Sequence, residues 1–263
     1  MITPQLVLMA TTVAIAACVQ GSIGIGFALI VAPVLAFLRP ELLPVSLLFL
    51  MLPLNLFTLL REHQAFDWKG GSWITLGRAF GTLAGAGVLA ALSSHALNLL
   101  IGAATVVIAV VTMVAPAFSP NRSGFLMVGL LTGISETATG IGGPPLALAY
   151  QHHRPDVLRS TVAGCFLLGE LLSVGVLAAI GRSTTQQALS AALLLPFLAI
   201  GGLVSSFVRH SVNGRILRAL VLIFAITSGA VLIVQVKQDG KAGWNFQPLP
   251  AAIASTVRLP KSS

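Results

Sequence analysis

The stretch QGSIGIGF, residues 20–27, interrupts the first long apolar run of the chain, and TATGIGGPP, residues 137–145, interrupts the fifth. Glycine and proline weaken a helix interior by about 1 and 3 kcal/mol relative to alanine, so several together should break each helix. Both runs, at about 5–38 and 123–151, are too long for one simple membrane crossing of roughly 20 residues. We therefore expect each run to form two pieces joined at a glycine-rich break.

Six further apolar runs have the ordinary length of a membrane-spanning helix. They lie at about residues 41–60, 72–92, 96–117, 157–180, 186–208 and 214–236. The chain of 263 residues is 56% hydrophobic and only 8% charged, whereas soluble domains carry roughly 25% charged residues. So few charges suit a surface that is solvated by lipid. The predicted fold class is an all-α polytopic membrane protein with eight hydrophobic segments.

A constant offset relates the two halves of the chain. An offset of 116 residues carries Gly24 to Gly140 and Gly85 to Gly201. It also aligns the second, third and fourth segments with the sixth, seventh and eighth. This register indicates an internal duplication into two four-element repeats. Interrupted segments at matching positions of two halves are typical of the binding site of a secondary transporter.

The duplication divides the chain into three parts. We expect an N-terminal repeat at 1–120 and a C-terminal repeat at 121–236. The remainder, 237–263, contains charged residues, proline and serine without an apolar period. We interpret it as a flexible extramembrane tail.

The basic residues between the segments test the topology. If all eight segments cross the membrane, these residues divide six against six between the two faces. If the first and fifth segments are instead hairpins that enter and leave on one side, eight share a face and four lie on the other. The eight are Arg61, Lys69, Arg122, Arg154, Arg159, Arg209, Arg215 and Arg218. The hairpin arrangement restores the positive-inside bias, so we expect two inverted repeats, re-entrant first and fifth segments, and both termini outside the cytoplasm.

Three motifs carry a resemblance to a known family. They are QGSIGIGFALIVAPVL at 20–35, GLLTGISETATGIGGPPLAL at 129–148 and the glycine pattern LGRAFGTLAGAGVL at 76–89. Together with the two-times-four layout, they resemble the TauE/SafE family of sulfite and organosulfonate exporters over about residues 5–236. The resemblance implies a multi-pass carrier of the bacterial inner membrane for small anions, often sulfur-containing ones.

Two residues depart from the family pattern. Phe27 stands where a glycine or a similarly small residue is more usual, and Glu136 inside the second glycine motif has no evident counterpart. Both departures bear on which substrate is carried.

The glycine tracts are the candidate substrate site. Irregular backbone is tolerated at membrane depth only where it is buried in protein or lines a cavity. Each tract would leave N–H groups free at the start of the next helix, where they and the helix dipole bind anions. Close helix packing through glycine is the alternative. The candidate substrate-binding residues are Gln20, Gly21, Ser22, Gly24, Gly26, Glu136, Thr137, Thr139, Gly140, Gly142 and Gly143.

Three charged residues fall inside apolar segments: Arg78, Glu136 and Glu170. A charge at this depth costs about 2.5–3.5 kcal/mol on insertion scales, so it normally faces a cavity or a partner. We expect Glu136 or Glu170 to carry a coupled proton. The alternative is a structural pair with Arg78, or an Arg78 side chain that snorkels to the interface. Asn55 and Gln151 are further polar candidates, either for substrate contact or for bridging helices.

A set of glycines on the third segment has a structural interpretation. Gly77, Gly81 and Gly85 follow one another at intervals of four residues, which places them on one helix face. Small residues spaced in this way let two membrane helices approach closely. We expect this face to pack against another helix.

Other chemistries find little support in the sequence. Cys18 and Cys165 are far apart and form no disulfide framework, and their roles stay open. The adjacent His152 and His153 do not share a helix face, so no metal site is expected. The net charge of +8 is spread singly between apolar runs, which argues against nucleic acid binding. We expect no enzyme activity and no cofactor.

The residues predict a secondary transporter that works by alternating access, with the proton as candidate coupling ion, and the resemblance implies that it exports a small sulfur-containing anion. Import of a sulfur compound or another organic anion is one alternative, because a carrier follows its gradients. A membrane assembly factor without a substrate is the other. The expected partners are the anionic substrate and the lipid bilayer, and the sequence leaves open whether the chain forms a homodimer.

Overall fold

The computed structural model describes residues 4–114, 120–209 and 211–241. Within these ranges it contains ten α-helices, two short 3-10 helices and no strand. The helices are α1 (Pro4–Ile23), α2 (Phe27–Leu38), α3 (Val45–Glu62), α4 (Trp68–Ala91), α5 (Ser94–Val114), α6 (Arg122–Thr139), α7 (Gly143–Tyr150), α8 (Pro155–Ala179), α9 (Thr185–Val208) and α10 (Gly214–Lys241). The 3-10 helices are η1 (Pro40–Leu42) and η2 (His63–Ala65).

Seven of the described helices are long and apolar enough to cross a membrane: α1, α3, α4, α5, α8, α9 and α10. The predicted all-α polytopic membrane fold is confirmed at this level. α10 continues to Lys241, which is five residues into the predicted tail at 237–263, and the rest of that tail lies outside the described residues.

Both glycine tracts break the helix, as the sequence predicts. The break between α1 and α2 passes through Gly24 and Gly26, whose φ angles are 87° and 119°. The break between α6 and α7 begins at Gly140, whose φ angle is 80°. L-residues with a side chain rarely adopt this left-handed backbone, whereas glycine does so without steric cost. The glycines therefore stop α1 and α6 and let the chain change direction.

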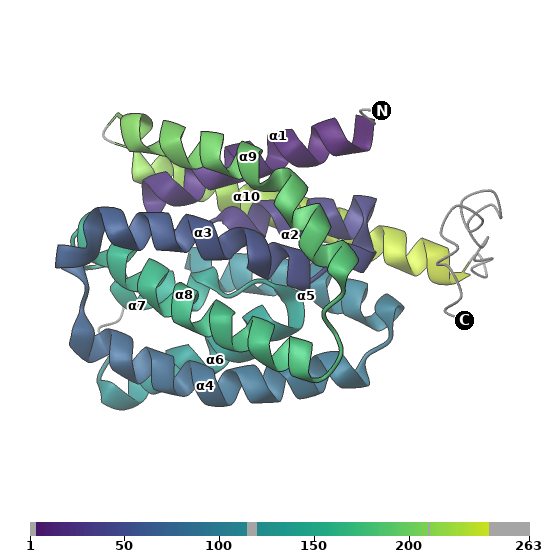
Figure 1. Ribbon diagram of the computed structural model, residues 1–263, viewed down its shortest axis with the longest axis horizontal. Coiled ribbons are helices and arrows are strands. Elements are labelled where there is room, and N and C mark those ends of the chain that lie inside the picture. The colour runs from purple at the N-terminus through teal and green to yellow at the C-terminus, as the bar shows by residue number, and fades with distance from the viewer. Residues whose placement is uncertain (1–3, 115–119, 210, 242–263) are drawn as a thin grey trace, which may run out of the picture.

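The long helices lie roughly alongside one another, so the bundle has two ends (Figure 1). At one end Arg61 of α3 donates to the Gly21 carbonyl oxygen at the end of α1, at 2.8 Å. Arg159, near the start of α8, donates to Glu62 at the end of α3, at 2.9 Å. Arg209, directly after α9, pairs with the same Glu62. We call this end, with its three arginines, the basic end.

The other helix termini lie at the opposite end of the bundle. The Gln187 side chain of α9 donates to the Glu41 carbonyl oxygen in η1, directly after α2, at 2.9 Å. Arg182, which precedes α9, donates to the Ala90 carbonyl oxygen at the end of α4, at 2.8 Å. α1 begins at this end, and α2 returns toward it after the break near the basic end (Figure 1).

Two helix pairs are packed unusually closely through glycine. A Cβ atom added at Gly77, Gly81 or Gly85 of α4 would clash with a backbone carbonyl oxygen of α6. The expected packing face of the third segment is confirmed. In α9, a Cβ atom at Gly201 would clash in the same way with the Ala14 carbonyl oxygen of α1. The pairs α4–α6 and α1–α9 therefore lie with their backbones in contact.

The main contacts between helices are preserved when each helix is exchanged for the helix 116 residues away in the sequence. The offset of 116 residues places α1 to α5 on α6 to α10. Under this exchange the pair α4–α6 becomes α9–α1, and the pair α4–α8 becomes α9–α3, and all four pairs are in contact. The pairs α3–α8 and α5–α10 map onto themselves and are also in contact.

Candidate functional site

A chain of buried hydrogen bonds joins the first glycine tract to two other helices. The Gln20 side chain of α1 donates to Asn55 Oδ1 of α3 at 3.0 Å, and Asn55 Nδ2 donates to Glu170 Oε1 of α8 at 2.7 Å. Gln20 Oε1 accepts from the N–H of Phe27, the first residue of α2, at 3.1 Å. Gln20 thus spans the break and links it to Glu170, and all three side chains are buried.

The buried charges meet beside this chain of hydrogen bonds. Arg78 of α4 forms an ion pair with Glu136 of α6, and both side chains are 0% exposed. The Arg78 guanidinium lies over the Phe166 ring, with its carbon 5.1 Å from the ring centroid. Glu170 of α8, a third buried charge, follows directly after Gly169, which lies against the Arg78 guanidinium. Of the two alternatives for Arg78, the structure contains the ion pair and not the snorkelling side chain.

The backbone is shaped to admit this pair. A Cβ atom at Gly169 of α8 would clash with the Arg78 guanidinium. A Cβ atom at Gly142, which precedes α7, would lie 2.8 Å from Glu136 Cβ. Glycine at these positions provides the space into which the two charged side chains extend from α4 and α6.

Several polar atoms of the cluster have no hydrogen-bond partner within the described residues. They are Arg78 Nε and Nη1, Glu136 Oε1, Glu170 Oε2 and Thr132 Oγ1. Leaving a buried polar group unpaired costs roughly 1–3 kcal/mol, and more for a charged group. A concentration of such atoms needs a reason beyond stability. We name the residues Gln20, Asn55, Arg78, Glu136 and Glu170 the central cluster.

The helix starts at the two breaks offer fewer free donors than the sequence suggests. The N–H of Phe27 already donates to Gln20. In the first turn of α7, Pro144 and Pro145 carry no N–H. The N–H of Ile141 donates to Thr139 Oγ1 at 3.3 Å. Substrate binding by the tracts stays a prediction. The charged and polar groups best suited to it are the side chains of the central cluster.

The hydroxyl groups of the tracts bond mainly within the protein. Ser22 donates to the Cys18 carbonyl oxygen at 2.7 Å, and Thr139 donates to the Ser135 carbonyl oxygen at 2.6 Å. Thr137 shares a hydrogen bond of 2.8 Å with Ser173 of α8.

Other glycines of the tracts mark close contacts. A Cβ atom at Gly21 would clash with Ser205 of α9, and one at Gly140 with Leu47 of α3. A Cβ atom at Gly24 would lie 2.8 Å from the Leu158 side chain of α8. These positions fit the packing alternative that the sequence left open.

A pocket of about 490 Å³ opens at the basic end. Its charged lining consists of arginines, with no carboxylate among the lining residues that the structure describes: Arg159, Arg209, Arg215 and Arg218. Gln151, which the sequence offered as a polar candidate, lines this pocket together with Ser22 and stands apart from the central cluster.

Apolar side chains lie between the pocket and Arg78 of the central cluster. Ile25, within the first glycine break, lines the pocket. A Cβ atom at Gly143, the first residue of α7, would lie 3.7 Å from Ile25 and 3.8 Å from Phe166. Phe166 in turn lies against the Arg78 guanidinium. The pocket, Ile25, Phe166 and Arg78 therefore follow one another inward from the basic end.

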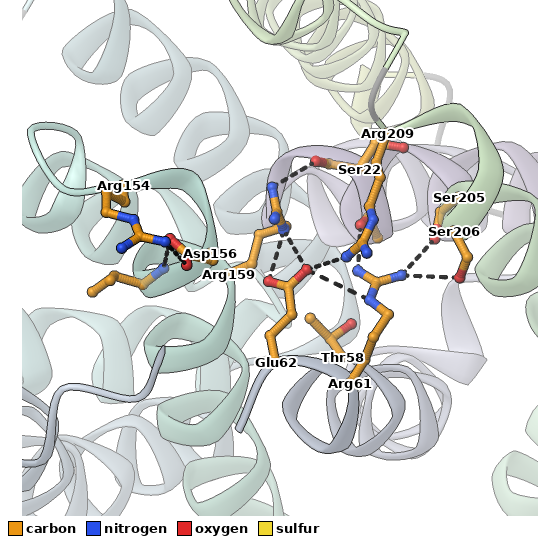
Figure 2. A network of polar contacts seen from close by, with 12 residues as sticks. Ser22, Thr58, Arg61, Glu62, Arg154, Asp156, Arg159, Ser205, Ser206 and Arg209 are labelled. Atoms are coloured by element: carbon orange, nitrogen blue, oxygen red, sulfur yellow. Dashed lines mark hydrogen bonds and ion pairs between the residues drawn. The ribbon is translucent and has the colours of Figure 1, made fainter. Parts of the chain in front are cut away.

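Glu62 holds together the arginines at the mouth of this pocket, and Figure 2 shows it between Arg61, Arg159 and Arg209. Arg61 also donates to Ser206 Oγ at 3.1 Å. Nothing in the sequence marks Glu62 as a site residue. The available signal was the sharing of one face by arginines of several segments, but only the fold brings them onto one carboxylate.

Neither cysteine pairs in the structure, and Cys18 and Cys165 are both free. Among the described residues there is no group of three or more His, Cys, Asp and Glu side chains that could hold a metal ion.

Comparison with known proteins gives one result at the level of the family. The family model described as "Sulfite exporter TauE/SafE" matches residues 9–232. No curated protein and no solved structure matches the chain.

Proposed function

The chain belongs to the TauE/SafE sulfite exporter family, and from this premise we propose that it exports sulfite or an organosulfonate across the inner membrane by alternating access. The single observation that carries the proposal is the route at the basic end. An arginine-lined pocket has Ile25 in its wall, Gly143 lies next to both Ile25 and Phe166, and Phe166 lies against Arg78 of the buried pair with Glu136. An anion needs cationic groups along its path, and this route provides them at both ends.

We propose that the basic end faces the cytoplasm. Eight straight crossings would place Arg61 on the face opposite Arg159 and Arg209, yet all three arginines pair with Glu62. This contact supports the arrangement with two hairpins, in which the basic residues accumulate on the cytoplasmic side. The hairpins are α1–α2 and α6–α7, and the termini then lie outside the cytoplasm.

The exchange of helix partners supports two inverted repeats. The pairs α4–α6 and α9–α1 correspond at the offset of 116 residues, and each joins one helix of either repeat. Because these pairs pack backbone to backbone, they move as units. Alternating access then comes from one glycine-packed pair moving against the other, rather than from one sequence half moving against the other.

Coupling to a proton follows from the charges of the central cluster. The single guanidinium of Arg78 pairs with Glu136, and a second buried carboxylate, Glu170, follows directly after Gly169, which lies against that guanidinium. When Glu136 takes up a proton, its attraction for Arg78 falls, and the guanidinium can hold an oxyanion in its place. The proton and the anion then occupy the site together and cross together. Export results when the anion accumulates in the cytoplasm.

Flux through the purified protein in proteoliposomes tests this function. Sulfite, thiosulfate and ethanesulfonate are loaded in turn, and efflux is recorded with and without a pH gradient. We expect efflux of at least one anion that responds to the gradient, and faster efflux when the anion is concentrated on the side of the basic end. Absence of flux for all three anions would contradict the proposal and favour an assembly factor.

A further inference from the structure

The latch at the basic end combines one carboxylate with an excess of cations. Glu62 accepts hydrogen bonds from Arg159 Nε at 2.9 and 3.1 Å, pairs with Arg209, and lies 3.6 Å from Arg61 Nε. Its side chain is only 8% exposed, so solvent screens these contacts weakly. Three guanidinium groups against one carboxylate leave net positive charge beside the pocket, and two of these groups, those of Arg159 and Arg209, line it. We call Glu62, Arg61, Arg159 and Arg209 the latch.

The latch also holds the end of α1. Arg61 donates to the Gly21 carbonyl oxygen at 2.8 Å, and Arg159 donates to the Ser22 carbonyl oxygen at 3.5 Å. The last carbonyl groups of a helix have no partner within the helix and carry its partial negative charge, so cations stabilise them. Arg159 therefore joins Glu62 on one side to the first glycine break on the other (Figure 2).

Two arginines of the latch face the pocket as well. Arg159 and Arg209 line it, and so does Ile25, which lies between the pocket and Phe166. The volume of about 490 Å³ lies within the range of roughly 300–1,000 Å³ that is usual for small-ligand sites. The planar fork of a guanidinium matches a carboxylate and a tetrahedral oxyanion in the same way. A sulfonate or sulfite oxygen in the pocket can therefore compete with Glu62 for these arginines.

We propose that the pocket is a docking site for the substrate oxyanion, which replaces Glu62 as the partner of Arg159 and Arg209 and so releases the end of α1. This inference rests on the proposed function, because it takes a sulfur oxyanion as the occupant. When Arg159 turns to the anion, the carbonyl of Ser22 loses its cation, and the break that contains Ile25 is less firmly held. Arrival of substrate thus opens the way to Phe166 and the central cluster.

Binding of radiolabelled sulfite to the full chain, purified in neutral detergent with phosphatidylcholine, tests the docking site without requiring transport. Arg159→Gln and Arg209→Gln each remove a charge-assisted hydrogen-bond partner, so we expect Kd to rise by roughly tenfold to a hundredfold. Arg154→Gln is the matched control, because Arg154 pairs with Asp156 at the same end of the molecule and its side chain is 81% exposed. The control should bind as the wild type does.

Variants of the Glu62 carboxylate test whether the oxyanion replaces Glu62 as the partner of the arginines. Glu62→Gln removes the competitor for the arginines, so we expect sulfite to bind several-fold more tightly. Asp156→Asn makes the same change of charge outside the latch and should leave Kd unchanged (Figure 2). If Glu62→Gln instead weakened binding, Glu62 would only position the arginines, and the exchange would be wrong.

Two further measurements, on lysine variants and with a different lipid, distinguish the possible results of the binding experiment. Arg159→Lys and Arg209→Lys keep the charge but lose the fork, and we expect an intermediate loss of affinity in protein that elutes as the wild type does. Unchanged Kd in both lysine and glutamine variants would overturn the docking site. Complete loss of sulfite binding when phosphatidylglycerol replaces phosphatidylcholine would do so too, because it would make the pocket a lipid-headgroup site.

The result is separable from the proposed function. If wild-type protein binds sulfite through Arg159 and Arg209 but moves no anion in proteoliposomes, the carrier function fails and the docking site stands. If the wild type moves sulfite and the variants bind and move it with unchanged constants, the docking site fails and the carrier function stands.

Discussion

The two charge clusters of this protein have opposite imbalances. The central cluster has one guanidinium, that of Arg78, and two carboxylates, those of Glu136 and Glu170, and all three side chains are fully buried. In the latch three guanidinium groups surround the single carboxylate of Glu62 near the surface. The latch can therefore attract an anion at any time, whereas the central cluster can accept one only after a carboxylate has been neutralised. In the proposed transport cycle, this difference separates binding of the substrate at the basic end from its entry into the central cluster.

The largest expected effect comes from removing the cation of the central cluster. Arg78→Met leaves two buried carboxylates without a cation, and breaking a buried ion pair in this way costs about 3–5 kcal/mol. We expect a strongly lowered thermal unfolding temperature in detergent and no measurable sulfite efflux. A variant with wild-type unfolding and flux would show that the buried charges are compensated elsewhere.

A smaller effect is expected from crowding the same guanidinium. Gly169→Ala places a Cβ atom where the Arg78 guanidinium lies, so we expect a loss of about 2 kcal/mol of stability and at least tenfold slower efflux. Gly175→Ala is the matched control, because it lies on the same helix and a Cβ atom there meets nothing within 4 Å. The control should be neutral or stabilised by up to about 1 kcal/mol, since alanine favours a helix over glycine. Equal stability and efflux of the two variants would show that the Arg78 guanidinium does not need the space at Gly169.

Neutralising a carboxylate of the central cluster should change the response of sulfite efflux to a pH gradient more than the rate of efflux itself. Glu136→Gln releases Arg78 permanently, so we expect sulfite efflux to persist but to respond less than twofold to a pH gradient that strongly drives the wild type. The measurement is the ratio of initial rates with and without the gradient. Glu170→Gln is measured in parallel, because Glu170 is the other candidate for the proton. An unchanged response in Glu136→Gln would clear that residue of the role.

The smallest effect is expected at the rim of the pocket. Arg215 lines the pocket, is exposed and takes no part in the latch. Arg215→Gln should raise KM for sulfite by about twofold to threefold at low ionic strength, through long-range attraction alone. The difference should disappear at high salt, where the Debye length falls to about 3 Å. A loss that persists in high salt would place Arg215 in direct contact with the anion.

The sequence was informative where local chemistry decides the structure. Left-handed backbone at Gly24, Gly26 and Gly140 follows from clustered glycines, and the four-residue spacing of Gly77 and Gly81 indicated the face that packs against α6. The depth of Arg78 and Glu136 in apolar segments suggested that they would have partners.

What the sequence could not supply was the pairing of distant residues. Gln20, Asn55 and Glu170 form one chain of hydrogen bonds although 35 and 115 positions separate the bonded pairs. In the sequence, Glu62 is an ordinary acidic residue at the end of a segment. Only the fold brings three helix termini together around it. The missing donors in α7 could have been foreseen, because Pro144 and Pro145 carry no N–H in any fold.

The contact between Gly201 and Ala14 has a consequence for how the chain is made. The ribosome synthesises α1 well before its close partner α9, because the helices α2 to α8 lie between them along the chain. At about 5–20 residues per second, the interval is on the order of 10–40 s. During that time α1 stays in the bilayer with its small-residue face turned to lipid or to a substitute helix. Biogenesis of this protein therefore depends on an α1 helix that remains without its close partner until α9 has been inserted.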